Sequence, residues 1–356
     1  MRWISSVPAR IVTPSSRLRS LLPALLLALL LPLLLPLLLP LQSPLLAAAF
    51  AAEPASQGAA AVTVSLQPIQ VAPHSWYVQG LPGMVSMQNQ GFNANAGFVI
   101  TREGVVVFDA LGTPGLGAAL LREIRQRTSL PIRRVIVSHY HADHFYGLQA
   151  FKQAGAEIWA HRRVQGYLAG DGPRIRLAER QQSLAPWVPR DMPLLAPDRY
   201  LDRDESFTLG GLQFQVRHIG PAHTAEDLML LVKEDGVAFV GDLIFTGRVP
   251  FVGDADSRAW LAAIDRILVD RPAVLVPGHG PASRDPQADL VLTRDYLLQL
   301  RKVMGDAVRD FVPVDEAVKG ADWSRFAALP AFEAAHRINA YGTYLQMERE
   351  ALAAPR

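Results

Sequence analysis

The sequence predicts an α+β protein in which two β-sheets pack face to face and helices cover their outer sides. Two β-rich stretches, each with helical segments, support this prediction, and together they span most of the chain beyond residue 60. Half of the 356 residues are apolar and 19% are charged, so the chain can bury a large core. Two sheets that each bury an apolar face are stable when they stack with helices outside.

The first stretch predicts strands wherever apolar positions alternate and β-branched residues are frequent. These strands cover residues 62–71, 75–80, 83–88, 96–101, 104–110 and 131–139. Apolar residues at helical spacing predict a helix over 115–127, and another helix is expected to begin near residue 145.

The same pattern recurs in the second stretch. Strands are expected over 158–161, 206–211, 212–220, 227–236, 236–242 and 273–280, and helices over 257–270 and 287–311. Between them, residues 162–200 show no clear periodicity and contain GDGP and APWVP. They are predicted to form a long surface loop, of the kind that often carries function.

The first 51 residues differ in composition from the rest. Four arginines precede a leucine-rich run, and the small residues AAAFAA follow it, with Ala49 and Ala51 at positions −3 and −1 of a cleavage site. This order predicts a secretory signal peptide over 1–51, and therefore an exported, periplasmic protein. The alternative is an uncleaved membrane anchor, since the apolar run is long enough to span a bilayer. Three prolines interrupt that run and favour cleavage.

Charge and cysteine content exclude several classes of protein. The leader holds four arginines and no acidic residue, so its removal changes the formal net charge from +2 to −2. A mature chain with this charge gives no argument for nucleic-acid binding. The chain has no cysteine, which excludes disulfides and thiolate ligands.

A cluster of histidines follows the strand predicted at 131–139. The stretch IVSHYHADHF places His139, His141, Asp143 and His144 within six residues. His139 and His141 are two residues apart, so in extended chain they point to the same side. Imidazole and carboxylate groups are ligands for zinc. One short loop can therefore direct two ligands at one metal and two at a neighbouring metal.

Three further ligand-type residues lie at predicted strand ends. His223 stands in GPAHT, Asp242 ends VAFVGD, and His279 lies between two glycines in PGHG. Loops at strand ends commonly hold binding groups. Together with the histidine cluster they supply enough nitrogen and oxygen ligands for a dinuclear hydrolytic centre.

The motifs HYHADH, AHT, VGD and PGHG, in this order, resemble those of the metallo-β-lactamase superfamily over about residues 65–285. The resemblance implies an αββα sandwich with the site at one edge and a catalytic domain over 66–285. A flexible start over 52–65 and a C-terminal helical extension over 286–356 would flank that domain.

The resemblance also implies roles for the seven residues. His139, His141 and His223 would bind one zinc ion, and Asp143, His144 and His279 would bind a second. Asp242 would bridge both ions, and a metal-bound hydroxide, acting with Asp143 and Asp242, would attack a carbonyl or another ester-like centre. Iron or manganese are alternatives to zinc.

The absence of cysteine narrows the choice within the superfamily. The best-known β-lactamase branches use a cysteine where this chain has Asp242, and the seven-residue set looks more like glyoxalase II. VGDLIFTGRVPFVGDAD and the late INAYGTYLQMERE resemble exported members known as quinoprotein-relay zinc metallohydrolases. We therefore expect an exported hydrolase of an ester, lactone, thioester or amide-like bond in a small molecule. A β-lactamase, an iron-dependent sulfur-compound oxygenase and a binding protein with a vestigial site are the alternatives.

A few other residues are candidates for supporting roles. Arg248 is a candidate for binding a substrate carboxylate, and Tyr146 for donating to an oxyanion, although an ion pair and core packing are the competing interpretations. Asp109 is expected to support the ligand loop, and Glu226 and Asp227 to orient the loop after AHT. His161 is expected to be structural. Oligomeric state is not predicted.

Overall fold

The computed structural model describes residues 60–353. The predicted signal peptide over 1–51 lies outside the described residues, as does most of the flexible start expected at 52–65. No helix within 60–353 has the length and apolar character needed to cross a membrane.

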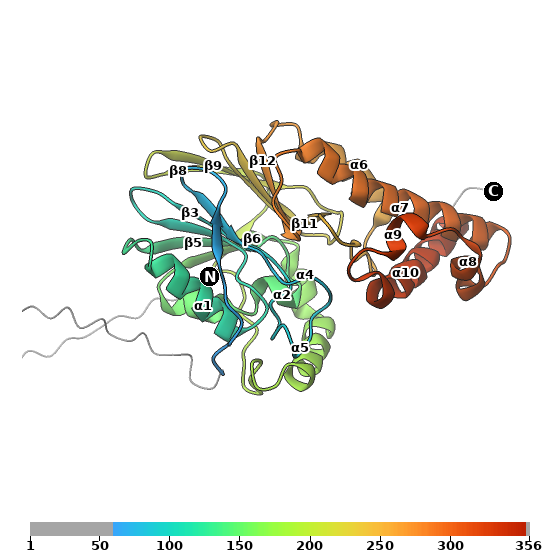
Figure 1. The fold of residues 1–356 in the computed structure, drawn as a ribbon, viewed down its shortest axis with the longest axis horizontal. Coiled ribbons are helices and arrows are strands. Elements are labelled where there is room, and N and C mark those ends of the chain that lie inside the picture. The colour runs from blue at the N-terminus through green and yellow to red at the C-terminus, as the bar shows by residue number, and fades with distance from the viewer. Residues whose placement is uncertain (1–59, 354–356) are drawn as a thin grey trace, which may run out of the picture. The chain divides into compact units, whose positions relative to one another are not determined.

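Two sheets form the centre of the fold (Figure 1). The first has seven strands in the order β1 (Pro68–Gln70), β2 (Ser75–Val78), β3 (Ala96–Ile100), β4 (Val105–Phe108), β5 (Ile132–Ile136), β6 (Glu157–His161) and β7 (Arg199–Leu201). Its first four strands are antiparallel neighbours, and β4 to β7 run parallel.

The second sheet has five strands. Their order is β12 (Val274–His279), β11 (Val237–Phe245), β10 (Leu228–Val232), β9 (Leu212–His218) and β8 (Glu205–Leu209). Neighbours are antiparallel except β11 and β12, which are parallel.

Side-chain alternation along β4 shows how the layers pack. Phe108 faces the second sheet, where its ring centre lies 5.9 Å from that of Phe239. Val107 points the other way, into a cluster beneath the helices. A side chain at Gly97 would overlap Phe239, so glycine permits the sheets to approach here. The two sheets therefore form a sandwich with an apolar interior.

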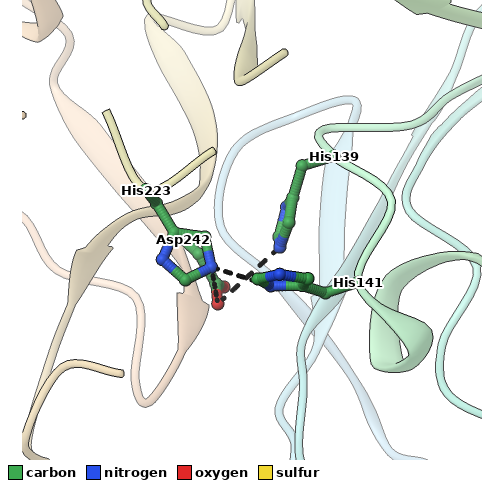
Figure 2. Close-up of side chains that lie close together, drawn as sticks. All are labelled: His139, His141, His223 and Asp242. Carbon is green, nitrogen blue, oxygen red and sulfur yellow. Dashed lines mark hydrogen bonds and ion pairs between the residues drawn. The ribbon is translucent and has the colours of Figure 1, made fainter. Parts of the chain in front are cut away.

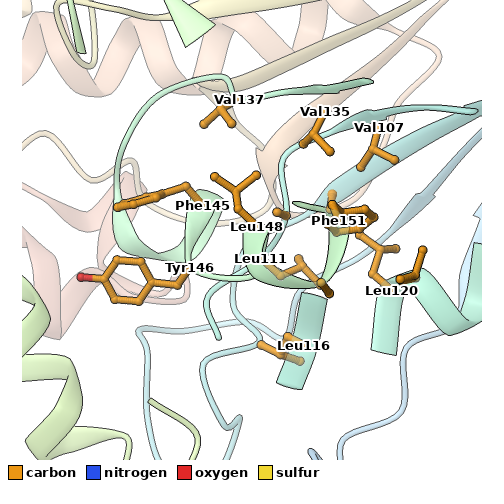
Figure 3. Packing of buried hydrophobic residues seen from close by; sticks show 14 of the residues in the cluster. Val107, Leu111, Leu116, Leu120, Val135, Val137, Phe145, Tyr146, Leu148 and Phe151 are labelled. Carbon is orange, nitrogen blue, oxygen red and sulfur yellow. The ribbon is translucent and has the colours of Figure 1, made fainter. Parts of the chain in front are cut away.

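Helices cover the first sheet on its outer face. α1 (Pro114–Arg125) and α3 (Leu148–Gln153) bury Leu116, Leu120 and Phe151 against the strand valines, as Figure 3 shows. Thr113 caps α1, because its side chain accepts from the Leu116 amide while Pro114 occupies the first turn. The cap and the apolar face together make this the helix that the sequence predicts.

The second sheet is covered by α6 (Ser257–Ile267) and α7 (Pro286–Arg309). Three further helices follow, α8 (Val314–Gly320), α9 (Ser324–Ala327) and α10 (Phe332–Ala353), and gather with α7 at one end of the molecule (Figure 1). Their apolar residues share one core with β11. The predicted αββα sandwich is confirmed; the domain boundaries stay predictions.

Two local predictions are wrong, and the strand predicted over 62–71 forms only at Pro68–Gln70. Residues 83–88 form a turn instead of a strand, because the side chains of Ser86 and Asn89 each accept from the other's amide. Residues 162–200 include α4 (Val164–Ala169) and α5 (Gly172–Ser183) instead of one long loop. Pro173 is the one buried residue of α5, so this helix has no apolar stripe for a periodicity argument to detect.

Candidate metal centre

All seven predicted ligand residues lie at one edge of the sandwich. The segment after β5 supplies four of them, and its short helix α2 (Ala142–Phe145) begins after His141. The second sheet supplies His223 from the loop between β9 and β10, Asp242 from β11 and His279 from the end of β12. Asp242 was expected to end its strand, but β11 continues to Phe245. Gly241 makes this feasible, since it adopts φ +54° where the register shifts.

The side chains form two groups. His139, His141, His223 and Asp242 make the first, shown in Figure 2, and Asp143, His144 and His279 make the second. Within each group, one nitrogen or oxygen atom from every residue lies within 4.8 Å of the others. Nitrogen and oxygen atoms gathered in this way could hold a divalent ion.

Asp242 lies between the two groups. Its Oδ2 is 3.4 Å from Nε2 of His223 in the first group, and its Oδ1 is 3.2 Å from Nε2 of His144 in the second. Oδ2 is also 3.3 Å from Nε2 of His279. This carboxylate therefore faces both groups at once.

Hydrogen bonds fix which ring nitrogen faces the centre. His144 donates from Nδ1 to Asp109 at 2.8 Å, and His279 donates from Nδ1 to the Asn93 carbonyl oxygen at 2.7 Å. Nδ1 of His139 lies 2.9 Å from the Ser138 hydroxyl. In all three residues Nε2 is left to face the centre, an arrangement typical of histidine ligands.

The charges of the site favour cation binding. Burial lowers the pKa of His139 well below its usual value and that of His223 to about 3, so both rings are neutral. Burial would raise the pKa of Asp143, but the neighbouring His144 and His279 lower it to about 2. The site thus combines neutral imidazoles with ionised carboxylates, which is the state that metal binding requires.

His144 is the exception among the imidazoles. Burial opposes a charge on this ring, yet the carboxylates of Asp242, Asp109 and Asp143 raise its pKa well above the ordinary value. These three carboxylates therefore create a potential that attracts positive charge to the second group.

Glycines allow the close backbone approach that brings His279 to Asp242. A Cβ at Gly278 would lie 2.0 Å from Asp242 Oδ1 and 2.7 Å from the Gly241 carbonyl carbon. Gly280 has φ +92° and lies against the Thr246 carbonyl oxygen. Glycine is thus required at position 278 because a side chain would overlap Asp242, and it is favoured at position 280 because φ is positive there.

A cavity of about 300 Å³ opens beside the first group. His141, His223 and Tyr167 of α4 are among its lining residues. Asp254 and Asp256 come from the segment before α6. The cavity gives a small molecule access to the first group, and its acidic residues outnumber its basic ones.

Comparison with known proteins agrees with this geometry. The family model described as the metallo-beta-lactamase superfamily matches residues 89–279, more than half of the chain. The chain belongs to this superfamily. The match spans all seven clustered residues.

Two curated relatives and one solved structure illustrate the superfamily's range. The chain is 27% identical over 194 residues to the metallo-beta-lactamase type 2 of Elizabethkingia meningoseptica, covering 53% of this chain and 69% of the relative. It is 26% identical over 177 residues to a hydroxyacylglutathione hydrolase of Haemophilus influenzae, covering 48% of this chain and 79% of the relative. A metallo-beta-lactamase from Pontibacter korlensis shares the fold with a TM-score of 0.52 and 23% identity, over 66% of this chain and 99% of that one. The chain is a metal-dependent hydrolase of this superfamily, and its His/Asp cluster is a divalent metal site.

The candidate supporting residues have defined partners in this superfamily fold. Asp109 accepts from His144 and from Ser138, as expected of a residue supporting the ligand loop. Asp227 accepts from the amide and hydroxyl of Thr224, so it shapes the loop that carries His223. His161 stacks on His218 with ring centres 3.6 Å apart, away from the seven clustered residues.

The two candidate substrate residues are buried. Arg248 donates to the Gly83 carbonyl oxygen at 2.9 Å and is 4% exposed, so its guanidinium anchors the 81–88 segment beside His279. Tyr146 is 1% exposed and packs in the cluster beneath α1. Their roles toward substrate stay predictions.

Two asparagines of the site were missed by sequence reasoning. Asn93 donates to Asp143 at 2.9 Å and accepts from His279 through its carbonyl oxygen. Asn95 donates to the carbonyl oxygens of Pro277 and Gly280, and so holds the PGHG turn. Both asparagines stand in the stretch NQGFNANAG, which leads into a buried strand. In sequence this stretch resembles an ordinary turn, so it did not indicate a role in the site.

Proposed function

We propose that the chain is an exported dinuclear zinc hydrolase in which all seven residues bind metal. His139, His141 and His223 hold one ion, Asp143, His144 and His279 hold the other, and Asp242 bridges them. The observation that carries this proposal is the position of Asp242, whose two oxygens face the two groups. The leader-like sequence over 1–51 supports export.

The residues fit two ions because buried atoms that face the centre lack other partners. Nε2 of His139, Nε2 of His144 and Oδ1 of Asp242 are buried and have no hydrogen-bond partner among residues 60–353. Leaving such atoms unsatisfied is costly. Bound metal satisfies them, and it also supplies Lewis acidity and acidifies water for attack at neutral pH.

Residues of the chain position the attacking water and the substrate. Asp143 is the most accessible of the clustered carboxylates, and Asn93 fixes its Oδ2. Its other oxygen can accept a hydrogen bond from the attacking water and take its proton. The cavity beside His141 and His223 receives the substrate, and the bond cleaved is an ester, lactone, thioester or amide-like bond.

The decisive experiment combines metal analysis with a substrate panel. The mature chain is reconstituted with zinc and its metal content is measured by mass spectrometry. We expect two zinc ions per chain, and fewer than one would refute the dinuclear site. The panel holds a chromogenic β-lactam, a hydroxyacylglutathione thioester, a lactone and sulfate and phosphate esters. His141→Ala is the control, and it should abolish turnover of whichever compound is cleaved.

Hydrolysis of β-lactams is the second candidate function. The similarity to the Elizabethkingia meningoseptica metallo-beta-lactamase over 194 residues favours it, and a periplasmic location suits it. Aspartate at position 242, in place of the cysteine ligand expected of that branch, speaks against it. Turnover of the chromogenic β-lactam that disappears with chelator would establish it.

A further inference from the structure

One wall of the cavity is built by a segment that has no regular structure of its own. Residues 249–257 follow β11 and end at Ser257, the first residue of α6, and Asp254, Ala255 and Asp256 of this segment line the same cavity as His141 and His223. Such a segment takes a fixed shape only where other parts of the molecule satisfy its backbone groups.

The C-terminal helix α10 supplies those partners. Oδ1 of Asn339 accepts from the amides of Val252 and Gly253 at 2.8 and 3.2 Å. Its Nδ2 donates to the Pro250 carbonyl oxygen at 2.8 Å and to the Tyr296 hydroxyl at 3.0 Å. Asn339 is fully buried, so all four hydrogen bonds of this amide are directed inside the protein.

Two more residues of α10 contact the same segment, one and two turns farther along the same face. A Cβ at Gly342 would lie 1.7 Å from the Gly253 carbonyl oxygen, so the helix and the segment are in direct backbone contact. Oε1 of Gln346 accepts from the amide of Ser257 at 3.1 Å and from its hydroxyl at 2.6 Å. Its Nε2 donates to Asp256 at 3.0 Å.

The buried face of α10 is unusual for a helix that only packs. A packing helix presents a stripe of apolar residues to its neighbours, whereas here the buried positions include Asn339, Thr343 and Gln346. Buried polar groups are costly unless each is satisfied. Because the partners of Asn339 and Gln346 include the cavity segment, these side chains specify one conformation of that segment.

We propose that α10 is part of the substrate site, with Asn339, Gly342 and Gln346 as positioning residues that fix residues 249–257 as a cavity wall. The effect that we expect on turnover rests on the proposed hydrolytic function. The wall touches substrate away from the metal groups, so moving it changes binding more than chemistry. The superfamily match ends at residue 279, so this wall depends on a part of the chain beyond the matched region.

The test uses two variants of α10 that alter the wall by different means. In Gly342→Ala, the new methyl group must displace the Gly253 carbonyl by roughly 1.5 Å to reach ordinary contact distance. In Gln346→Met, the shape of the side chain is kept while the hydrogen bonds to Ser257 and Asp256 are lost. Ile338→Ala and Tyr341→Ala are matched controls on the exposed face of the same helix, where these residues are 50% and 55% exposed.

The first readout is steady-state kinetics of the zinc-loaded mature chain on the probe of the panel that wild type cleaves. We expect KM to rise about tenfold in both test variants while kcat changes less than about threefold, since lost binding away from the reacting bond acts on KM. Zinc content should equal that of wild type, and the controls should match wild type throughout. An unchanged KM in both test variants, or an equal loss of zinc and kcat with KM unchanged, would overturn the proposal.

The second readout is amide hydrogen exchange, which needs no substrate. We expect faster exchange of residues 249–257 in both test variants, with β10 and β11 protected as in wild type. Unchanged protection of 249–257 would overturn the positioning role. If wild type cleaves no probe, the proposed function fails, while the exchange result still decides whether α10 fixes the wall.

Discussion

Asp109→Asn tests how the second metal group is held in place. The Asp109 carboxylate is 1% exposed and accepts three hydrogen bonds: from the Ser138 amide at 2.7 Å, from the Ser138 hydroxyl at 2.8 Å and from His144 Nδ1 at 2.8 Å. An asparagine keeps the first bond through Oδ1. Its amide nitrogen cannot accept from His144, so the ring loses the contact that directs Nε2 at the metal group.

The magnitude follows from the bond that is lost. A hydrogen bond to a charged partner contributes about 1.5–3 kcal/mol, which corresponds to a loss of roughly 10- to 100-fold in affinity. We expect this loss chiefly for one of the two zinc ions, because Asp109 contacts His144 of the second group directly, whereas it reaches the first group only through the Ser138 hydroxyl and His139. Competition titration with a chromogenic chelator would resolve the two binding steps.

The chain offers a matched control for this variant. Asp235 also accepts from a backbone amide, a serine hydroxyl and a histidine Nδ1, namely the amide and ring of His74 and the hydroxyl of Ser75. Asp235→Asn therefore removes similar bonds far from the metal groups, and its zinc affinity should equal that of wild type. Equal zinc affinity in Asp109→Asn and wild type, or an equal loss in both variants, would refute the reasoning.

Three further outcomes are expected. Gly278→Ala should weaken zinc binding in a chelator titration, because its Cβ overlaps Asp242, whereas Gly166→Ala, with nothing within 4 Å of the new methyl group, should not. Chelator-treated mature chain should lose all turnover and recover it on adding zinc; turnover that persists without metal would contradict the assignment. Burial lowers the pKa of His336 to about 4, so the stability from its neutral ring is present above pH 6.5 and is lost as pH falls toward 4. The urea midpoint should therefore fall less over this window in His336→Asn than in wild type, and an equal fall would show that His336 does not contribute.

The candidate site could be predicted from the sequence because its ligand-type residues stand in short motifs. Each ligand-type residue sits in or beside a strand that is rich in buried β-branched residues, as at β5 and β12, and the structure brings all seven together. Asn93 and Asn95 were not found, because their role depends on contacts with residues about 180 positions away. No local pattern encodes such distant partners.

The same reasoning explains where the fold was misread. Residues 83–88 alternate like a strand. The reciprocal hydrogen bonds between Ser86 and Asn89 stabilise a turn there in place of sheet pairing. Helix α5 has good helix-forming residues but no apolar stripe. Apolar periodicity therefore did not predict this helix, whereas intrinsic helix propensity would have predicted it. The cavity wall was not predicted either, since its shape is set by side chains on α10.

The metal centre also links the two halves of the sandwich. The segment after β5, in the first sheet, supplies four of the seven residues, and the second sheet supplies the other three. Backbone hydrogen bonds cross between the halves at this edge, from Leu228 to Ser138 at 2.9 Å and from Asn95 to Gly278 at 2.7 Å. A metal ion that binds both halves binds only the packed sandwich, so its binding free energy adds to the stability of the fold. The edge where the sheets meet is thus both the proposed catalytic edge and the place where bound metal would stabilise their packing.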